Sequence, residues 1–306
     1  MLAFLCACSN SEYIDYPSNS ELRFFGDNVI SASTNDTFNS TDSLYPIDTE
    51  YPYAGIPRLV IKTDNFQPIN NRDTKIPAKM QLWGESSPIS EVINPTIKGR
   101  GNSSWLYMPQ KSYKIELIQK HELLQMPPNR DWALISNYAD KTLMKNYLAY
   151  HLSTKLKAFY SPRCEFIELF LNNNYLGVYL LTETIKIGAK RINIPQNNNS
   201  YIIEKTQNYQ EKDQLIYSQT SKEDSNGVRF KVHYPQKAST EILTTIRDHI
   251  ENFERHLMAN KKGQDNHMDQ WININEYTKY YWVQEISKNP DAVTYSSVGY
   301  PFLGLV

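Results

Sequence analysis

The stretch Phe166-Ile-Glu-Leu-Phe-Leu-Asn-Asn-Asn-Tyr-Leu-Gly-Val-Tyr-Leu-Leu181 holds two apolar runs on either side of three asparagines. Short apolar runs rich in aromatic and branched side chains are typical of β-strands. Asparagine tolerates the backbone angles of a tight turn, and a polar turn is what such a connection needs. The stretch therefore predicts a β-hairpin, with strands over 166–171 and 175–181.

Further elements follow on both sides of this hairpin. Alternating or apolar runs predict strands over 59–63, 78–83, 112–117 and 201–204. The helical period predicts helices over 141–156, with Asp140 as the cap, and over 239–258 and 275–287. Because strands dominate the first part and helices the later part, the sequence predicts an α+β body of two unequal lobes.

The bulk composition excludes several classes of protein. Of 306 residues, 40% are hydrophobic and 21% are charged, and the net charge is -1. We therefore expect a body with a buried core, no nucleic-acid partner and no general attraction to an anionic membrane. No apolar run approaches the roughly 18 residues that a membrane-spanning helix needs. A lone body cysteine, Cys164, excludes a disulfide within the body and a cysteine-based zinc site, and is expected to be a small buried hydrophobe.

The first residues indicate export. The short apolar stretch that ends in Leu5-Cys6-Ala7-Cys8 resembles a bacterial lipobox, whose final cysteine becomes lipidated. We therefore expect residues 1–8 to be a lipoprotein signal remnant, with Cys8 as the lipidation site. Residues 9–50 are acidic and rich in Ser, Asn and Thr, which is typical of an extended tether. The alternative is an N-terminal extension with no anchoring role.

Two basic stretches could bind phosphate. Lys98-Gly-Arg-Gly-Asn-Ser-Ser-Trp105 predicts a glycine turn between strands, where the backbone could approach a ligand and Lys98 and Arg100 add positive charge. An ordinary glycine turn is the alternative. Lys111-Ser-Tyr-Lys114 lies on the following strand, where lysines either pair with phosphate or face solvent.

A third candidate site follows the last predicted helix. Pro290 stops that helix and places Asn289 and Asp291 on a tight loop. A loop carboxylate can act as a general base or as a magnesium ligand, although such a turn can also be purely structural. His249 and His256, about two turns apart on a helix, are expected to be a solvent-facing pair rather than metal ligands.

Several separated motifs, taken in order, resemble one family. The motifs are Gly-Arg-Gly-Asn-Ser-Ser-Trp105, Pro-Gln-Lys-Ser-Tyr-Lys114, Trp132-Ala-Leu-Ile-Ser-Asn-Tyr-Ala-Asp-Lys141, Asn146-Tyr-Leu-Ala149, Tyr175-Leu-Gly-Val-Tyr-Leu-Leu-Thr-Glu183 and Lys288-Asn-Pro-Asp-Ala292. Together they resemble the spore coat protein H (CotH) kinase-like family, from about residue 55 to about 298. The resemblance implies an atypical protein-kinase-like, two-lobed fold. It also implies an enzyme that uses ATP with Mg²⁺ or Mn²⁺ to phosphorylate Ser residues of secreted, surface or coat proteins.

The resemblance also assigns roles to residues. Asp291 matches the aspartate of the family's Asn-x-Asp loop and would act as base or, with Asn289, as metal ligand. Positive charge for the phosphates would come from Lys111 or Lys114, with Arg100 nearby. Glu183 matches a characteristic family position whose role stays open between a hinge and an ion pair. This division of labour is what phosphoryl transfer needs.

The end of the chain departs from the family. The family continues to a Gly-Pro-x-Trp-Asp-Phe-Asp segment that supplies another metal-binding aspartate, whereas this sequence ends in an apolar run. We therefore expect residues 51–298 to form a partial CotH kinase-like domain with an incomplete C-terminal lobe, followed by a divergent tail at 299–306. Catalysis would then be impaired. The alternative is a non-catalytic surface lipoprotein that uses the same fold for binding.

Overall fold

The structure is a computed structural model that describes residues 6–7, 44–46, 50–197, 200–206, 209–218, 229–261, 267–289 and 292. The chain divides into two compact units. The barrel unit comprises Ile14–Lys145 and Arg163–Thr184, and the sheet–helix unit comprises Met1–Tyr13, Asn146–Pro162 and Ile185–Val306. Strands and helices both contribute, so the predicted α+β class is confirmed. The kinase-like arrangement of two lobes stays a prediction.

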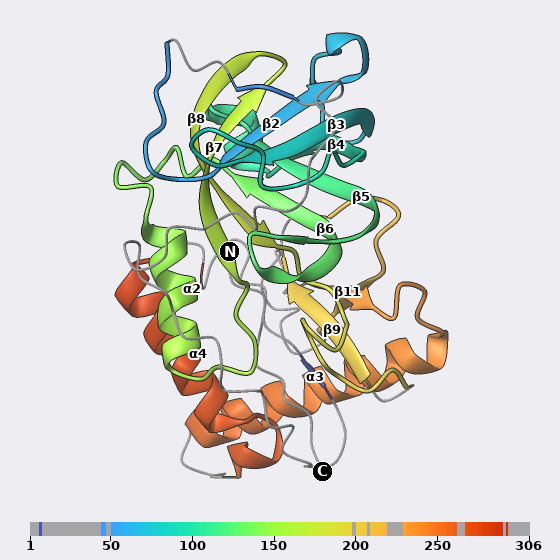
Figure 1. Cartoon of the computed structure of the whole chain (residues 1–306). Coiled ribbons are helices and arrows are strands. Elements are labelled where there is room, and N and C mark those ends of the chain that lie inside the picture. The colour runs from blue at the N-terminus through green and yellow to red at the C-terminus, as the bar shows by residue number, and fades with distance from the viewer. Residues whose placement is uncertain are drawn as a thin grey trace. The chain divides into compact units, whose positions relative to one another are not determined.

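A closed barrel forms the barrel unit, with strands in the order β2-β3-β4-β5-β6-β8-β7 (Figure 1). These strands are β2 (Arg58–Thr63), β3 (Ile76–Trp83), β4 (Pro95–Arg100), β5 (Ser112–Leu123), β6 (Met126–Ile135), β7 (Cys164–Leu171) and β8 (Asn174–Glu183). Neighbours pair antiparallel except β2 and β7, which pair in parallel and close the ring. Short helices η1 (Asp64–Phe66) and α1 (Ser103–Tyr107) lie in the connections.

Alternation along each strand decides what fills the barrel. Successive side chains of a strand point to opposite faces, so every second residue enters the interior. On β5 these are Tyr113, Ile115 and Leu117, and on β6 they include the fully buried Trp132 and Leu134. On β5 the intervening residues Lys114 and Glu116 lie on the outside of the barrel, where their charges can be hydrated.

The predicted hairpin is confirmed as β7 and β8. Asn172 and Asn173 have φ angles of 52° and 66°, the left-handed backbone that a two-residue hairpin turn requires. Asparagine tolerates this conformation better than most residues. The Asn172 side chain also accepts a hydrogen bond from the Thr63 backbone N–H at 2.9 Å, which ties the turn to β2.

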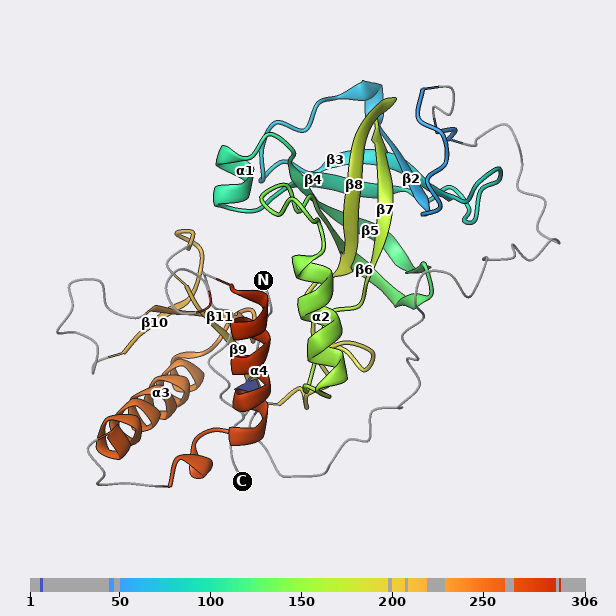
Figure 2. The same ribbon diagram turned by 90° about the vertical axis from the view of Figure 1, so that its left-hand side faces the viewer.

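A sheet covered by a helix forms the core of the sheet–helix unit. The strand order is β1-β9-β11-β10, with β1 (Cys6–Ala7), β9 (Ser200–Lys205), β10 (Leu215–Tyr217) and β11 (Arg229–Tyr234). Helix α3 (Thr240–Lys261) runs along one face of this sheet (Figure 2). Ile246, Ile250 and Phe253 of α3 pack there against Tyr201 of β9 and Phe230 of β11.

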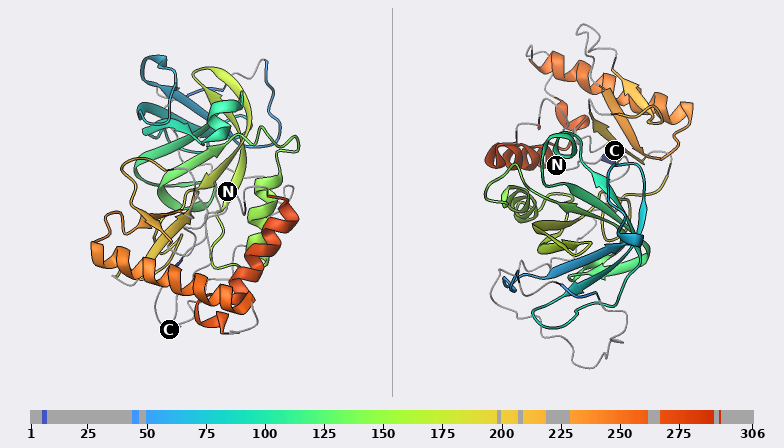
Figure 3. Two further views of the ribbon diagram at one scale, coloured as in Figure 1. Left: turned by 180° about the vertical axis from the view of Figure 1, so that it is seen from behind. Right: turned by 90° about the horizontal axis from the view of Figure 1, so that it is seen from above.

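Helices α2 (Lys145–Lys155) and α4 (Ile274–Ser287) lie side by side in the same unit (Figure 3). The Glu276 carboxylate of α4 accepts a hydrogen bond from the Phe159 backbone N–H at 2.7 Å, just after α2. Lys279 donates to the Lys157 carbonyl at 2.7 Å. A 3-10 turn, η2 (Met268–Gln270), precedes α4. No helix of the described residues is both long and apolar enough to cross a bilayer.

Helix α2 begins later than its sequence pattern predicts. The predicted helix started at Lys141, but Leu143 has a φ of 59° and breaks the helical backbone. Asp140 instead accepts hydrogen bonds from the Thr142 side chain and, at 2.8 Å, from the Lys145 backbone N–H. Asp140 therefore bonds to the first residue of the helix, as a cap would, but it lies five residues before that residue and not directly before the helix as predicted.

The N-terminal part of the chain meets the barrel before residue 50. Leu44 is buried with Val60, Trp83 and Phe170, and its backbone N–H donates to Gln81 at 2.8 Å. Most of the expected tether at 9–50, the lipidation site Cys8 and the tail at 299–306 lie outside the described residues.

Candidate functional site

A group of charged side chains gathers on the outside of the barrel over β5 and β6. Lys114 and Glu116 face outward from the first half of β5, since Tyr113, Ile115 and Leu117 between and beside them enter the core. Glu116 lies directly opposite Asp131 of β6 in the antiparallel register. Cross-strand neighbours of this kind are close enough to interact directly.

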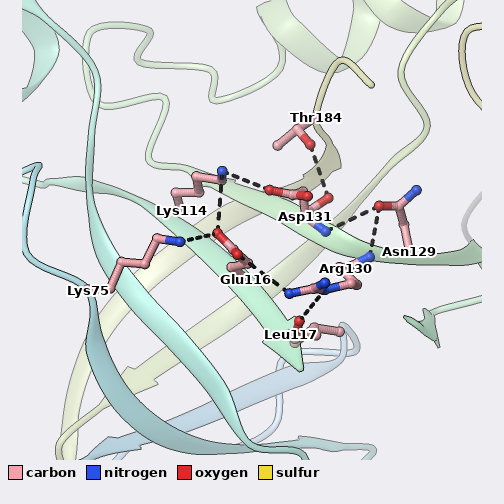
Figure 4. Close-up of polar contacts among 8 residues, drawn as sticks. All are labelled: Lys75, Lys114, Glu116, Leu117, Asn129, Arg130, Asp131 and Thr184. Atoms are coloured by element: carbon pink, nitrogen blue, oxygen red, sulfur yellow. Dashed lines mark hydrogen bonds and ion pairs between the residues drawn. The ribbon is translucent and has the colours of Figure 1, made fainter. Parts of the chain in front are cut away.

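These side chains form one network, which we name the charge cluster: Lys75, Lys114, Glu116, Arg130 and Asp131 (Figure 4). The Lys114 amine lies 2.7 Å from the Asp131 carboxylate and 3.9 Å from Glu116. Glu116 is also 2.7 Å from the Lys75 amine and 3.7 Å from the Arg130 guanidinium. Three cations therefore share two carboxylates.

The cluster has an excess of positive charge. The hydrogen bond from Lys75, opposed by partial burial and supported by the charges of Lys75 and Lys114, lowers the pKa of Glu116. Glu116 is therefore ionised at neutral pH, and the three cations exceed the two carboxylates by one charge. An anion with several oxygens, such as a phosphate chain, suits this environment.

Lys98 and Arg100 add to this side of the barrel. Both lie within β4, where Lys98 is opposite Lys114 and Arg100 is opposite Ser112. Ile97 enters the core, so its neighbour Lys98 and, two residues on, Arg100 face outward. They therefore lie on the same side of the sheet as Lys114, which is opposite Lys98. Both are half-buried.

The predicted glycine turn between strands lies within 98–105, but only the second of its two glycines forms it. Lys98–Arg100 is strand, and the chain turns only at Gly101, whose φ is 108°. A Cβ atom on Gly99 would lie 2.5 Å from the Trp105 ring and 2.7 Å from the Asn71 carbonyl. Close packing of the chain's own Trp105 therefore explains Gly99, in place of the close approach of a ligand.

The two candidate lysines, Lys111 just before β5 and Lys114 on β5, have different surroundings. The Lys111 amine donates to the Trp105 carbonyl at 2.6 Å and lies 5.7 Å from the centre of the Trp105 ring. Lys111 is thus engaged in holding α1. Lys114 lies in the charge cluster beside Lys98, so it is the better placed of the two for an anion.

Glu183 ends β8 and is buried. Its carboxylate accepts a hydrogen bond from the Arg163 backbone N–H at 3.0 Å and pairs with the Arg163 guanidinium at 3.0 Å. The sequence left the role of Glu183 open between a hinge and an ion pair. Within the barrel unit, Glu183 forms an ion pair with Arg163.

The loop after α4 is described only in part. The Asn289 amide donates to the Gln284 side chain at 2.7 Å, and the Tyr280 hydroxyl donates to the Ala292 carbonyl at 3.2 Å. Asp291 lies outside the described residues. Within the part of the chain that the structure describes, no three His, Cys, Asp or Glu side chains gather as a metal site would require. A metal centre at Asn289 and Asp291 therefore stays a prediction.

The two histidines of α3 are not the solvent-facing pair that was expected. His249 and His256 both contact the Trp271 ring, with ring centres 5.8 and 4.6 Å away. Burial lowers the pKa of His249 to about 4. Two turns of helix thus bring both rings onto Trp271, which follows η2, and the pair contributes to packing.

Of the charge cluster, sequence reasoning named only Lys114 and missed the other four members, Asp131 among them. The strand β6 was not predicted, because Pro127, Pro128 and the polar residues 129–131 hide its alternation. The apolar run that begins with Trp132 was the available signal. Asp131 comes close to Lys114 only because β6 pairs with β5.

Comparison with known proteins gives one family. The model of the family described as CotH kinase protein matches residues 97–300, about two thirds of the chain. No curated protein sequence matches the chain at a significant level. The match begins within β4 and includes β5 and β6, so it covers Lys98, Lys114 and Asp131, and it extends over Asn289 and Asp291. The chain therefore belongs to the CotH kinase protein family.

Proposed function

We propose that the chain is an ATP-dependent phosphotransferase that phosphorylates Ser residues of secreted or surface proteins. The family match supports this most directly, because it covers both the basic side of the barrel and the loop with Asp291. The excess positive charge of the cluster fits the phosphates of a nucleotide. Phosphoryl transfer relies in part on cations at the phosphates, and Lys98, Arg100 and Lys114 are cations on this side of the barrel.

Each residue has a role in the proposed reaction. Lys114, with Lys98 and Arg100 beside it, would hold the phosphate oxygens of ATP. Asp291 would accept the proton of the acceptor Ser hydroxyl as the Ser oxygen bonds to the γ-phosphorus and the bond to the ADP oxygen breaks. A divalent metal, when bound, would neutralise charge on the triphosphate. Asn289 and Asp291 carry the kinds of oxygen that Mg²⁺ or Mn²⁺ prefers.

Nucleotide binding tests the phosphate role of Lys114. Lys114→Ala should weaken ATP binding at least about tenfold, or ~1.4 kcal/mol, because a phosphate contact is lost. Lys79→Ala is the matched control, since Lys79 is an exposed lysine of β3 outside the cluster. Isothermal titration with both variants measures the difference. Equal ATP affinity in the Lys114 variant and the parent would remove Lys114 from the site.

Transfer itself needs a separate assay. Radiolabelled ATP with Mg²⁺ or Mn²⁺ and a Ser-rich acceptor protein should give labelled acceptor, and Asp291→Ala should reduce the rate at least about a hundredfold. ATP binding without transfer in the intact protein would favour the alternative, a non-catalytic binding protein. Transfer that is unchanged in Asp291→Ala would show that another group acts as base.

We also propose that the protein is exported and held at the bacterial cell surface or in the periplasm through a lipid on Cys8. The lipobox-like Leu5 to Cys8 and the acidic stretch that follows it support this placement. An acceptor in the same compartment would be a secreted or surface protein.

A further inference from the structure

We propose that Asp131 is the positioning residue for Lys114: it holds the lysine amine where the phosphates of a nucleotide bind. This inference rests on the proposed function. It adds a residue from β6 that neither the sequence motifs nor the family match assigns. The contact that motivates it is the 2.7 Å ion pair between the Lys114 amine and the Asp131 carboxylate.

Glu116 is the competing partner for Lys114, and the geometry favours Asp131. The Glu116 carboxylate lies 3.9 Å from the Lys114 amine, beyond hydrogen-bond distance. The same carboxylate has a 2.7 Å contact with Lys75 and a 3.7 Å contact with Arg130. Glu116 thus serves mainly the other two cations, and Asp131 makes the close contact with Lys114.

Asp131 is itself well fixed. Its neighbour Trp132 is fully buried in the barrel, and the Trp132 indole N–H donates to the Asn129 carbonyl at 3.1 Å. The Asp131 backbone N–H donates to the Asn129 side chain at 3.3 Å, and its carbonyl accepts from the Thr184 hydroxyl at 3.2 Å (Figure 4). The carboxylate therefore projects from a backbone held on both sides.

A fixed partner matters because a lysine side chain is flexible. Ordering a free lysine costs rotamer entropy, and a binding site gains affinity when that ordering precedes the ligand. The pair is partly shielded, with side-chain exposures of 27% for Lys114 and 15% for Asp131. Such a pair is less screened by water and salt than an exposed one.

The sign of the effect separates positioning from simple charge. Asp131 is negative, so its field alone repels phosphate. If Asp131 acted only through its charge, Asp131→Asn would tighten ATP binding. If it positions Lys114, the same change weakens binding and lowers kcat, while Asp131→Glu restores part of both.

The experiment compares ATP and adenosine binding in the full chain. For Asp131→Asn we expect the Kd of ATP to rise about tenfold, ~1.4 kcal/mol, and the Kd of adenosine to stay unchanged, since adenosine has no phosphate. Asp131→Glu should recover at least about a third of the lost binding energy. Glu122→Gln removes the same charge from an exposed position on β5 and should match the parent. Melting temperatures of all variants verify that they are folded.

A double-mutant cycle tests whether Asp131 acts through Lys114. In the Lys114→Ala background, Asp131→Asn should cause no further loss of ATP binding, and removal of its negative charge should leave the affinity equal or slightly higher. Additive losses, unchanged or tighter ATP binding in Asp131→Asn, or an equal loss for adenosine would each overturn the inference. A parent chain that does not bind ATP would instead overturn the proposed function itself, and the inference with it.

Discussion

Gly99 of β4 lies so close to the Trp105 ring that no larger residue fits there without a shift. Gly99→Ala should destabilise the protein by about 1–3 kcal/mol, because the new methyl group would overlap the Trp105 ring and the Asn71 carbonyl. Gly188→Ala is the control, since a Cβ atom there would meet no atom within 4 Å. Urea unfolding measures both. A Gly99→Ala variant as stable as the Gly188 variant would contradict the packing of Trp105 on β4.

A half-buried carboxyl gives the barrel a predictable pH dependence. Burial raises the pKa of Glu165 from 4.5 to about 7. Because the folded state holds this proton more tightly than the unfolded state, its contribution to stability is present below pH 4.5 and is lost as the pH rises towards 7. Glu165→Gln should therefore stabilise the protein at pH 8, by at most about 3 kcal/mol, and have little effect at pH 4.

Unfolding free energies of Glu165→Gln and the parent at several pH values measure this effect. The exposed Glu122→Gln should leave the pH dependence as it is in the parent. A Glu165 variant whose stability follows the same pH curve as the parent would show that the carboxyl is solvated and ionised in the folded state.

At the scale of elements, the turn of the β7–β8 hairpin depends on left-handed backbone. Asn173 is exposed and has a φ of 66°, so Asn173→Val should cost about 1–2 kcal/mol, and Asn173→Gly should be neutral or slightly stabilising. Chemical unfolding of the two variants gives the comparison. Lys79→Val places the same residue on exposed, extended backbone and should be close to neutral. A harmless Asn173→Val would mean that the turn has another geometry.

For the whole molecule, the proposed anchor is tested by where the protein is found. In its native host, Cys8→Ser should move the protein from the membrane fraction to the soluble exported fraction, because the lipid cannot be attached. Cys6→Ser is the matched control and should stay with the membrane. Fractionation followed by immunoblotting distinguishes them. Unchanged fractionation of the Cys8 variant would leave only the alternative of an extension without an anchor.

Much of the local structure could be predicted from the sequence. The hairpin of β7 and β8 and the helices α3 and α4 were predicted close to their observed bounds, because each element buries one face and this leaves a periodic pattern in its own residues. Several separated motifs in the correct order also pointed to the family, whose model matches residues 97–300.

Only the tertiary structure decided how the strands close and which charges meet. The ring closes where β2 pairs in parallel with β7, for example Leu59 with Leu169, and nothing in either strand specifies a partner so distant in sequence. Likewise, the sequence left Lys111 and Lys114 equivalent. Trp105 engages the first and Asp131 the second, because strand register, which the pattern of a single strand does not contain, determines which side chains become neighbours.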